Sequence, residues 1–139
     1  NSKLLDCPPH GILIDECLKQ ARDYDHVIIH TSTPSLKNDC KVAEAIKAQR
    51  PGTKIGFVGA HTAVLPTETL KASPAIDWVG RKEFDFTCKE VAEGRALKDV
   101  AGTAARFKVP MTTAVTLAQS RPPPGKVGRG SWSTVKISR

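Results

Sequence analysis

Residues 27–34 read Val-Ile-Ile-His-Thr-Ser-Thr-Pro, an apolar run that gives way to a small polar loop. The same succession recurs at residues 55–62, Ile-Gly-Phe-Val-Gly-Ala-His-Thr, and at residues 76–83, Ile-Asp-Trp-Val-Gly-Arg-Lys-Glu. Each loop leads into a helical pattern, and repeated strand–loop–helix units form a parallel sheet with helices on both faces. Such sheets bind ligands outside the carboxyl ends of their strands. We therefore predict an α/β fold with a binding site in these three loops.

Apolar spacing predicts the elements around these strands. Residues 3–7 form a further strand, and Ser35 caps the helix that follows the second strand. Pro66 opens a short helix near residues 68–71, and Gly94 ends the last helix. The helical stripes are Ile14, Cys17, Leu18 and Ala21; Leu36, Cys40, Ala43 and Ile46; and Phe84, Cys88, Val91 and Ala92.

Charge divides the chain of 139 residues at about residue 100. Residues 1–100 carry fourteen Lys and Arg against fourteen Asp and Glu, whereas residues 101–139 carry seven Lys and Arg and no acid. This second part is rich in Pro, Gly and Thr, so we expect a basic, irregular tail with short strands at most near 107–109 and 134–137. Nucleic-acid binding is disfavoured because only Phe107 and Trp132 offer stacking faces there. A shifted reading frame or a gene fusion is the alternative origin of the tail.

Cysteine spacing and hydropathy indicate the compartment. The four cysteines, at residues 7, 17, 40 and 88, are far apart, as expected of buried, reduced thiols. We see neither a leader peptide nor an apolar run of roughly 20 residues that could cross a bilayer. We therefore expect a cytoplasmic protein without a membrane span.

Residues 27–34, 55–61 and 77–83 together resemble the cobalamin (vitamin B12)-binding domain at the amino end of many radical S-adenosylmethionine enzymes. The matching motifs are Thr31-Ser32-Thr33-Pro34, then Gly59-Ala60-His61-Thr62 with Leu65-Pro66, then Asp77-Trp78-Val79 ending at Glu83. The resemblance covers residues 3–98, and the motifs are most similar to those of the hopanoid-biosynthesis branch. It implies a flavodoxin-like (Rossmann-like) domain over residues 1–100 that binds and positions cobalamin for a radical barrel partner.

The cofactor site implied by this resemblance lies in the three loops. Cobalamin is large and mostly flat, and its nucleotide tail enters a slot between strand ends and helices, where small residues and hydroxyl groups are needed. The alternative is that the loops only cap helices and make turns. The implied cofactor-binding residues are Thr31, Ser32, Thr33, Pro34, Gly59, Ala60, His61, Thr62, Gly80, Arg81 and Glu83.

The chain also departs from that family. The central first strand and its helix are missing, and Ala60-His61 replaces the usual Gly-Pro-His. Without a C-x-x-x-C-x-x-C motif the chain holds no iron–sulfur cluster, so we expect no catalysis by the chain itself. His10, in Asp6-Cys7-Pro8-Pro9-His10-Gly11, is a candidate axial cobalt ligand with the wrong spacing, and a plain loop histidine is its alternative.

Two further expectations follow from the missing strand. Its absence leaves unpaired strand edges that another chain could cover, so we expect a homodimer formed by edge pairing or by exchange of a tail strand. It could also abolish the cofactor slot. The alternative function is therefore a structural or protein-interaction domain that keeps the fold without cobalamin.

Overall fold

The computed structural model describes residues 2–7, 11–81, 83–106 and 135–138. Its centre is a six-stranded sheet with the strand order β1-β6-β2-β3-β4-β5. The strands are β1 (Ser2–Leu5), β2 (His26–His30), β3 (Lys54–Val58), β4 (Trp78–Gly80), β5 (Thr103–Ala105) and β6 (Val135–Ser138). Because β2, β3 and β4 are parallel and are followed by helices, the chain has the predicted flavodoxin-like α/β fold.

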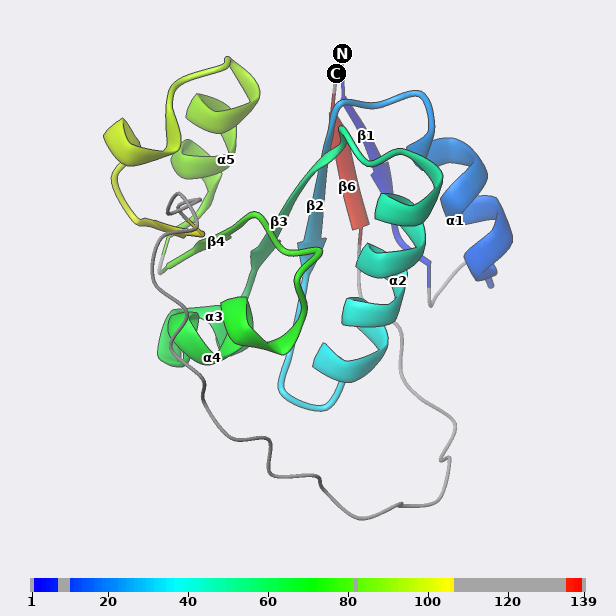
Figure 1. Ribbon diagram of the computed structural model, residues 1–139, viewed down its shortest axis with the longest axis horizontal. Coiled ribbons are helices and arrows are strands. Elements are labelled where there is room, and N and C mark those ends of the chain that lie inside the picture. Colours follow the sequence, from blue (N-terminus) through cyan, green and yellow to red (C-terminus); the bar gives the residue numbers. More distant parts are fainter. Residues whose placement is uncertain (1, 8–10, 82, 107–134, 139) are drawn as a thin grey trace, which may run out of the picture.

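Helices flank the sheet on both sides (Figure 1). They are α1 (Ile14–Ala21), α2 (Leu36–Gln49), α3 (Ala60–Val64), α4 (Pro66–Ala72) and α5 (Asp85–Ala92), with a 3₁₀ turn at Leu97–Asp99. The helices α1 and α2 pack with Val27, Ile29 and Phe57 in one core, whereas α5 packs with Ile28, Val58 and Trp78 in the other. Side chains thus alternate between two covered faces, as the continuous apolar strands predicted.

The centre of the sheet holds the largest difference from the prediction. β6, from the segment expected to be an irregular tail, lies between β1 and β2 and pairs antiparallel with both. Ile137 stands opposite Lys3 on one side and Val27 on the other. The place between β1 and β2 that was expected to be vacant is therefore filled from within the chain, by an antiparallel strand. A short strand was expected near residues 134–137 and is present as β6, but its pairing between β1 and β2 was not expected, and neither was the strand β5.

The same finding removes the reason given for a homodimer. Neither β1 nor β2 presents an unpaired edge to the gap, because the backbone of β6 pairs with four residues of each. A second chain is therefore not needed to complete this part of the sheet. The expected strand at 107–109 and the histidine at position 10 lie outside the described residues.

Close packing at Gly56 fixes the contact between β3 and β4. A Cβ atom at this position would lie 2.2 Å from the indole ring of Trp78. Trp78 is 1% exposed, and its ring occupies the space beside the glycine in the core that includes α5. Any side chain at Gly56 would displace that ring.

Candidate functional site

The three predicted loops meet at the carboxyl ends of β2, β3 and β4, at the bottom of the sheet in Figure 1. Thr33 Oγ1 lies 3.0 Å from His61 Nδ1, which joins the first loop to the second. The hydroxyl of Thr62 lies 2.8 Å from the carbonyl oxygens of both Gly59 and Gly80, which joins the second loop to the third. The parallel topology therefore places the predicted residues side by side.

Most polar groups of these loops bind one another. Thr31, which is fully buried, donates its hydroxyl to Asp39 Oδ2 at 2.6 Å. The hydroxyls of Ser32 and Ser35 are 2.9 Å apart, so Ser35 bonds within the loop and makes no side-chain cap for α2. These bonds stabilise the loops themselves, although no side chain of the first loop caps α2.

Gly59 occupies a backbone conformation that other residues rarely adopt. Its φ is 112°, and a Cβ atom there would lie 2.5 Å from the carbonyl oxygen of Thr31. The glycine therefore allows β2 and β3 to end close together before α3 begins. The need for a small residue at this position comes from the neighbouring loop.

The remaining predicted residues differ in their exposure. Ser32 is half-buried, whereas Thr33, Pro34 and Ala60 are exposed at the edge and available to a ligand. His61 is 8% exposed, and its Nε2 atom is buried without a hydrogen-bond partner. Arg81 and Glu83 are exposed, and the backbone N–H of Arg81 donates to the carbonyl of Gly102 at 2.7 Å, which attaches the third loop to β5.

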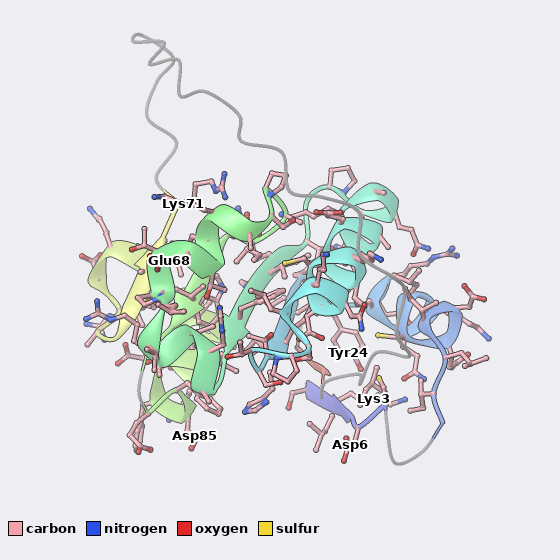
Figure 2. All side chains as sticks on the ribbon, turned by 90° about the horizontal axis from the view of Figure 1, so that it is seen from below. Lys3, Asp6, Tyr24, Glu68, Lys71 and Asp85 are labelled. Atoms are coloured by element: carbon pink, nitrogen blue, oxygen red, sulfur yellow. The ribbon has the colours of Figure 1, made fainter. Side chains whose placement is uncertain are left out.

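A pocket of about 280 Å³ lies beside these loops, on the face of the sheet covered by α5. We call it the α5 pocket. It lies beneath the first turn of α5, and the side chain of Leu4 from β1 reaches it from the opposite side; it is lined by Leu4, Ile28, His30, Val58, Phe84, Asp85 and Cys88. Figure 2, which views the molecule from below Figure 1, shows Asp85 at α5 and, across the sheet, Lys3 and Asp6 at the edge formed by β1.

The walls of the α5 pocket are mainly apolar, with two polar groups at its mouth. His30 ends β2 and contacts Phe84 edge to face, with ring centroids 5.9 Å apart and an interplanar angle of 62°. Asp85 begins α5 and is exposed. Apolar walls with few polar groups are typical of small-molecule sites. Sequence patterns did not indicate this pocket, because they do not show which side chains of β1 and α5 face the same part of the sheet.

Burial controls the chemistry of the cysteines. All four lie among the described residues, are buried, and form no disulfide. Burial raises the pKa of Cys17 to about 12 and that of Cys40 to about 11. Within the described ranges, no three His, Cys, Asp or Glu side chains are grouped as a metal site requires.

The chain matches no protein-family model and no curated protein sequence. No helix in the described part of the chain is both long and apolar enough to cross a membrane.

Proposed function

We propose that this domain binds a cobalamin, with the nucleotide tail of the cofactor in the α5 pocket. The observation that carries the proposal is the position of this pocket, which opens at the carboxyl ends of β2 and β3 next to the loops of the proposed site. A slot between the sheet and a helix at this edge is what a long, partly apolar tail requires. The exposed edge residues Thr33, Pro34 and Ala60 would then face the larger, flat part of the cofactor.

The lining of the α5 pocket suits a flat heterocyclic base. Ile28, Val58 and Phe84 provide apolar surface, and the ring of His30 adds an aromatic edge. Ser32 and Thr33 can offer hydroxyl groups to the phosphate and ribose of the tail. Cobalamin would supply methyl-transfer or radical chemistry when bound. The residues of this chain would only bind and orient it, for a separate radical S-adenosylmethionine barrel that holds the iron–sulfur cluster.

A protein-interaction domain is the second candidate function. The observation that favours it is the exposure of two large apolar residues, one on β1 and one on α5, because Leu4 is 64% exposed and Phe86 is 79% exposed. Apolar surface that extends beyond a small pocket is typical of a surface that contacts another protein.

Titration with hydroxocobalamin tests the first candidate. We expect a change in the visible spectrum and a calorimetric signal at micromolar protein. Leu4→Trp places a larger ring at the mouth of the pocket on an already exposed position, so it should weaken binding at least tenfold. Leu13→Trp is the matched control, because Leu13 is 73% exposed and is not among the residues that line the pocket.

The outcomes separate the two candidates. If neither spectrum nor heat changes at high micromolar protein, cobalamin binding is wrong and the interaction domain is favoured. Equal weakening by both variants would place the cofactor elsewhere on the molecule. Axial ligation by the histidine at position 10 is tested separately, since His10→Ala should leave the spectrum of the complex unchanged.

A further inference from the structure

A second cavity lies on the same face of the sheet as the α5 pocket, at the opposite end of the strands. It has a volume of about 340 Å³ and is lined by His26, Lys54, Trp78, Val91, Gly94, Arg95, Ala96 and Leu97. We call it the Lys54 pocket. The strands β2 and β3 begin here, at the top of the sheet in Figure 1, so this cavity is separate from the loops at their carboxyl ends.

Strand register explains why two basic side chains meet in the Lys54 pocket. His26 and Lys54 are the first residues of β2 and β3 and are direct partners in the parallel pair. Side chains two residues apart along a strand lie on the same face of the sheet. His26 therefore shares a face with Ile28, and Lys54 lies on the face of Val58, two residues beyond Gly56. This is the face that α5 covers.

The end of α5 brings a third basic side chain to the same place. The N–H of Gly94 donates to the carbonyl of Val91 at 3.1 Å. The N–H of Arg95 donates to the carbonyl of Glu90, also at 3.1 Å. These two bonds form a Schellman turn, which Gly94 permits with a φ of 85°. The turn satisfies carbonyl oxygens at the negative end of the helix and fixes the backbone of Arg95 beside the pocket.

Positive charge in the Lys54 pocket is not neutralised by the protein. Among the described residues that line it there is no Asp or Glu. The side chain of Lys54 has no hydrogen-bond or ion-pair partner in the described part of the chain, and the guanidinium of Arg95 has donors beyond the Nη1 group that binds Glu90. The carboxylates around the pocket are each paired with a base: Asp25 with Arg50, Asp77 with Lys47 at 2.8 Å, and Glu90 with Arg95 at 2.8 Å.

We propose that the Lys54 pocket binds a small phosphate monoester that carries a flat apolar group. Lys54 and Arg95 are both exposed at the mouth, where their cationic groups bind the phosphate oxygens. A monoester carries nearly two negative charges at neutral pH, which these two cations match. The apolar group lies against Trp78, Val91 and Leu97. Small-molecule sites span about 300 to 1,000 Å³, so this pocket takes a small ligand. This site is independent of cobalamin binding.

His26 provides a spectroscopic signature of an anion in this pocket. Burial lowers the pKa of its ring, Asp25 raises it, Lys54 lowers it and Asp77 raises it. A phosphate bound by Lys54 and Arg95 adds negative charge near the ring, and nearby negative charge favours the protonated imidazole. The pKa of His26 should therefore rise when the pocket is filled. A ligand bound elsewhere on the molecule should leave it unchanged.

Calorimetric titration of the full chain with phenyl phosphate, in a phosphate-free buffer, tests the proposal. We expect saturable binding that is about tenfold tighter than that of inorganic phosphate, because the phenyl ring leaves water for the apolar walls. Added sodium chloride should weaken the binding, since it screens the exposed cations. Proton NMR of the His26 ring at several pH values, with and without phenyl phosphate, measures the rise in its pKa.

Variants at exposed positions locate the site. Lys54→Gln removes the unneutralised charge and should weaken the binding of phenyl phosphate about tenfold. Ala96→Phe fills the mouth of the pocket and should weaken it as well. Lys41→Gln is the matched control, because Lys41 is an exposed lysine on α2 that does not line the pocket. The proposal would be overturned by absent binding, by equal affinity for inorganic phosphate, by equal weakening in the two glutamine variants, or by an unchanged pKa of His26.

Discussion

At the scale of single residues, His26 links stability to pH. It begins β2, its Nδ1 atom is buried without a hydrogen-bond partner, and burial lowers its pKa below the usual 6.5. The unfolded chain therefore binds a proton at this position more tightly than the folded protein does. The stabilisation is complete above about pH 6.5 and is lost as the pH falls from there through the lowered pKa of the folded state.

We expect the melting temperature to fall between pH 7.5 and pH 5, with His26 responsible for part of the decline. His26→Gln keeps a polar side chain that does not titrate, so its melting temperature should fall less over the same range. Differential scanning calorimetry at several pH values measures both profiles. Parallel profiles for the two proteins would show that other groups account for the decline.

Two residues of the resemblance have structural roles that the sequence motifs do not reveal. The carboxylate of Asp77 accepts a hydrogen bond from the backbone N–H of Ile55 at 2.7 Å and pairs with Lys47 at 2.8 Å. This pairing attaches the start of β4 to β3 and α2. At Gly59 a larger side chain would strain the turn, so a substitution such as Gly59→Leu would test the fold before it tested ligand binding.

At the scale of elements, sequence patterns predicted those helices and strands whose positions depend on residues that are close in the sequence. The four-residue apolar runs and the helical stripes gave β2, β3, α2 and α5 close to their observed bounds. The short helix α3 and the strand β5 were missed, because each depends on neighbours that are distant in sequence. β6 was expected only as an isolated short strand, since four residues carry no information about the strands beside them.

The candidate site was likewise predicted in part: the meeting of the loops was expected, and the α5 pocket was not. Parallel topology predicts that the loops after β2, β3 and β4 meet, and Thr33 and His61 do lie together. The α5 pocket could not be predicted, because it depends on how α5 packs on the sheet and on the position of β1 beyond β6. These are long-range contacts without a short sequence signature.

The position of β6 predicts a large effect of proline. Ile137 lies between β1 and β2, so its backbone N–H points toward a partner strand on one side or the other. Ile137→Pro should lower the free energy of unfolding by about 3 kcal/mol or more. Chemical denaturation monitored by circular dichroism measures the loss.

Ala105→Pro is the matched control. Arg106 N–H donates to Asp77 and Arg81 N–H to Gly102, so the alternation of bonds along β5 leaves the N–H of Ala105 pointing away from β4. Ala105→Pro should therefore lower the free energy of unfolding clearly less than Ile137→Pro does. A loss of similar size in both variants would mean that β6 is not a central strand.

At the scale of the whole molecule, truncation should produce the self-association first expected of the complete chain. A protein that ends at residue 134 lacks β6 and leaves the facing backbones of β1 and β2 unpaired. Such edges are templates for pairing with another chain. We expect the truncated protein to have a lower melting temperature and to form dimers or larger species.

Light scattering after size-exclusion chromatography, at several concentrations of both proteins, measures this difference. If the truncated protein remained a stable single chain, residues 135–138 would contribute little to folding and the sheet would not need β6. Association of the full chain to the same extent would instead show that it has another interface.

The late position of β6 in the chain also sets the order of events during synthesis. Leu5 and Val135 are direct neighbours in the sheet, yet the ribosome makes one near the beginning of the sequence and the other well over a hundred residues later. Until then β1 and β2 have emerged without β6, the strand that pairs with both. The pairing of β1 with β6 joins residues that are further apart in the sequence than in any other strand pair of the described sheet. A nascent chain arrested before residue 135 should therefore remain open to chaperones, and its release should complete the sheet in one late step.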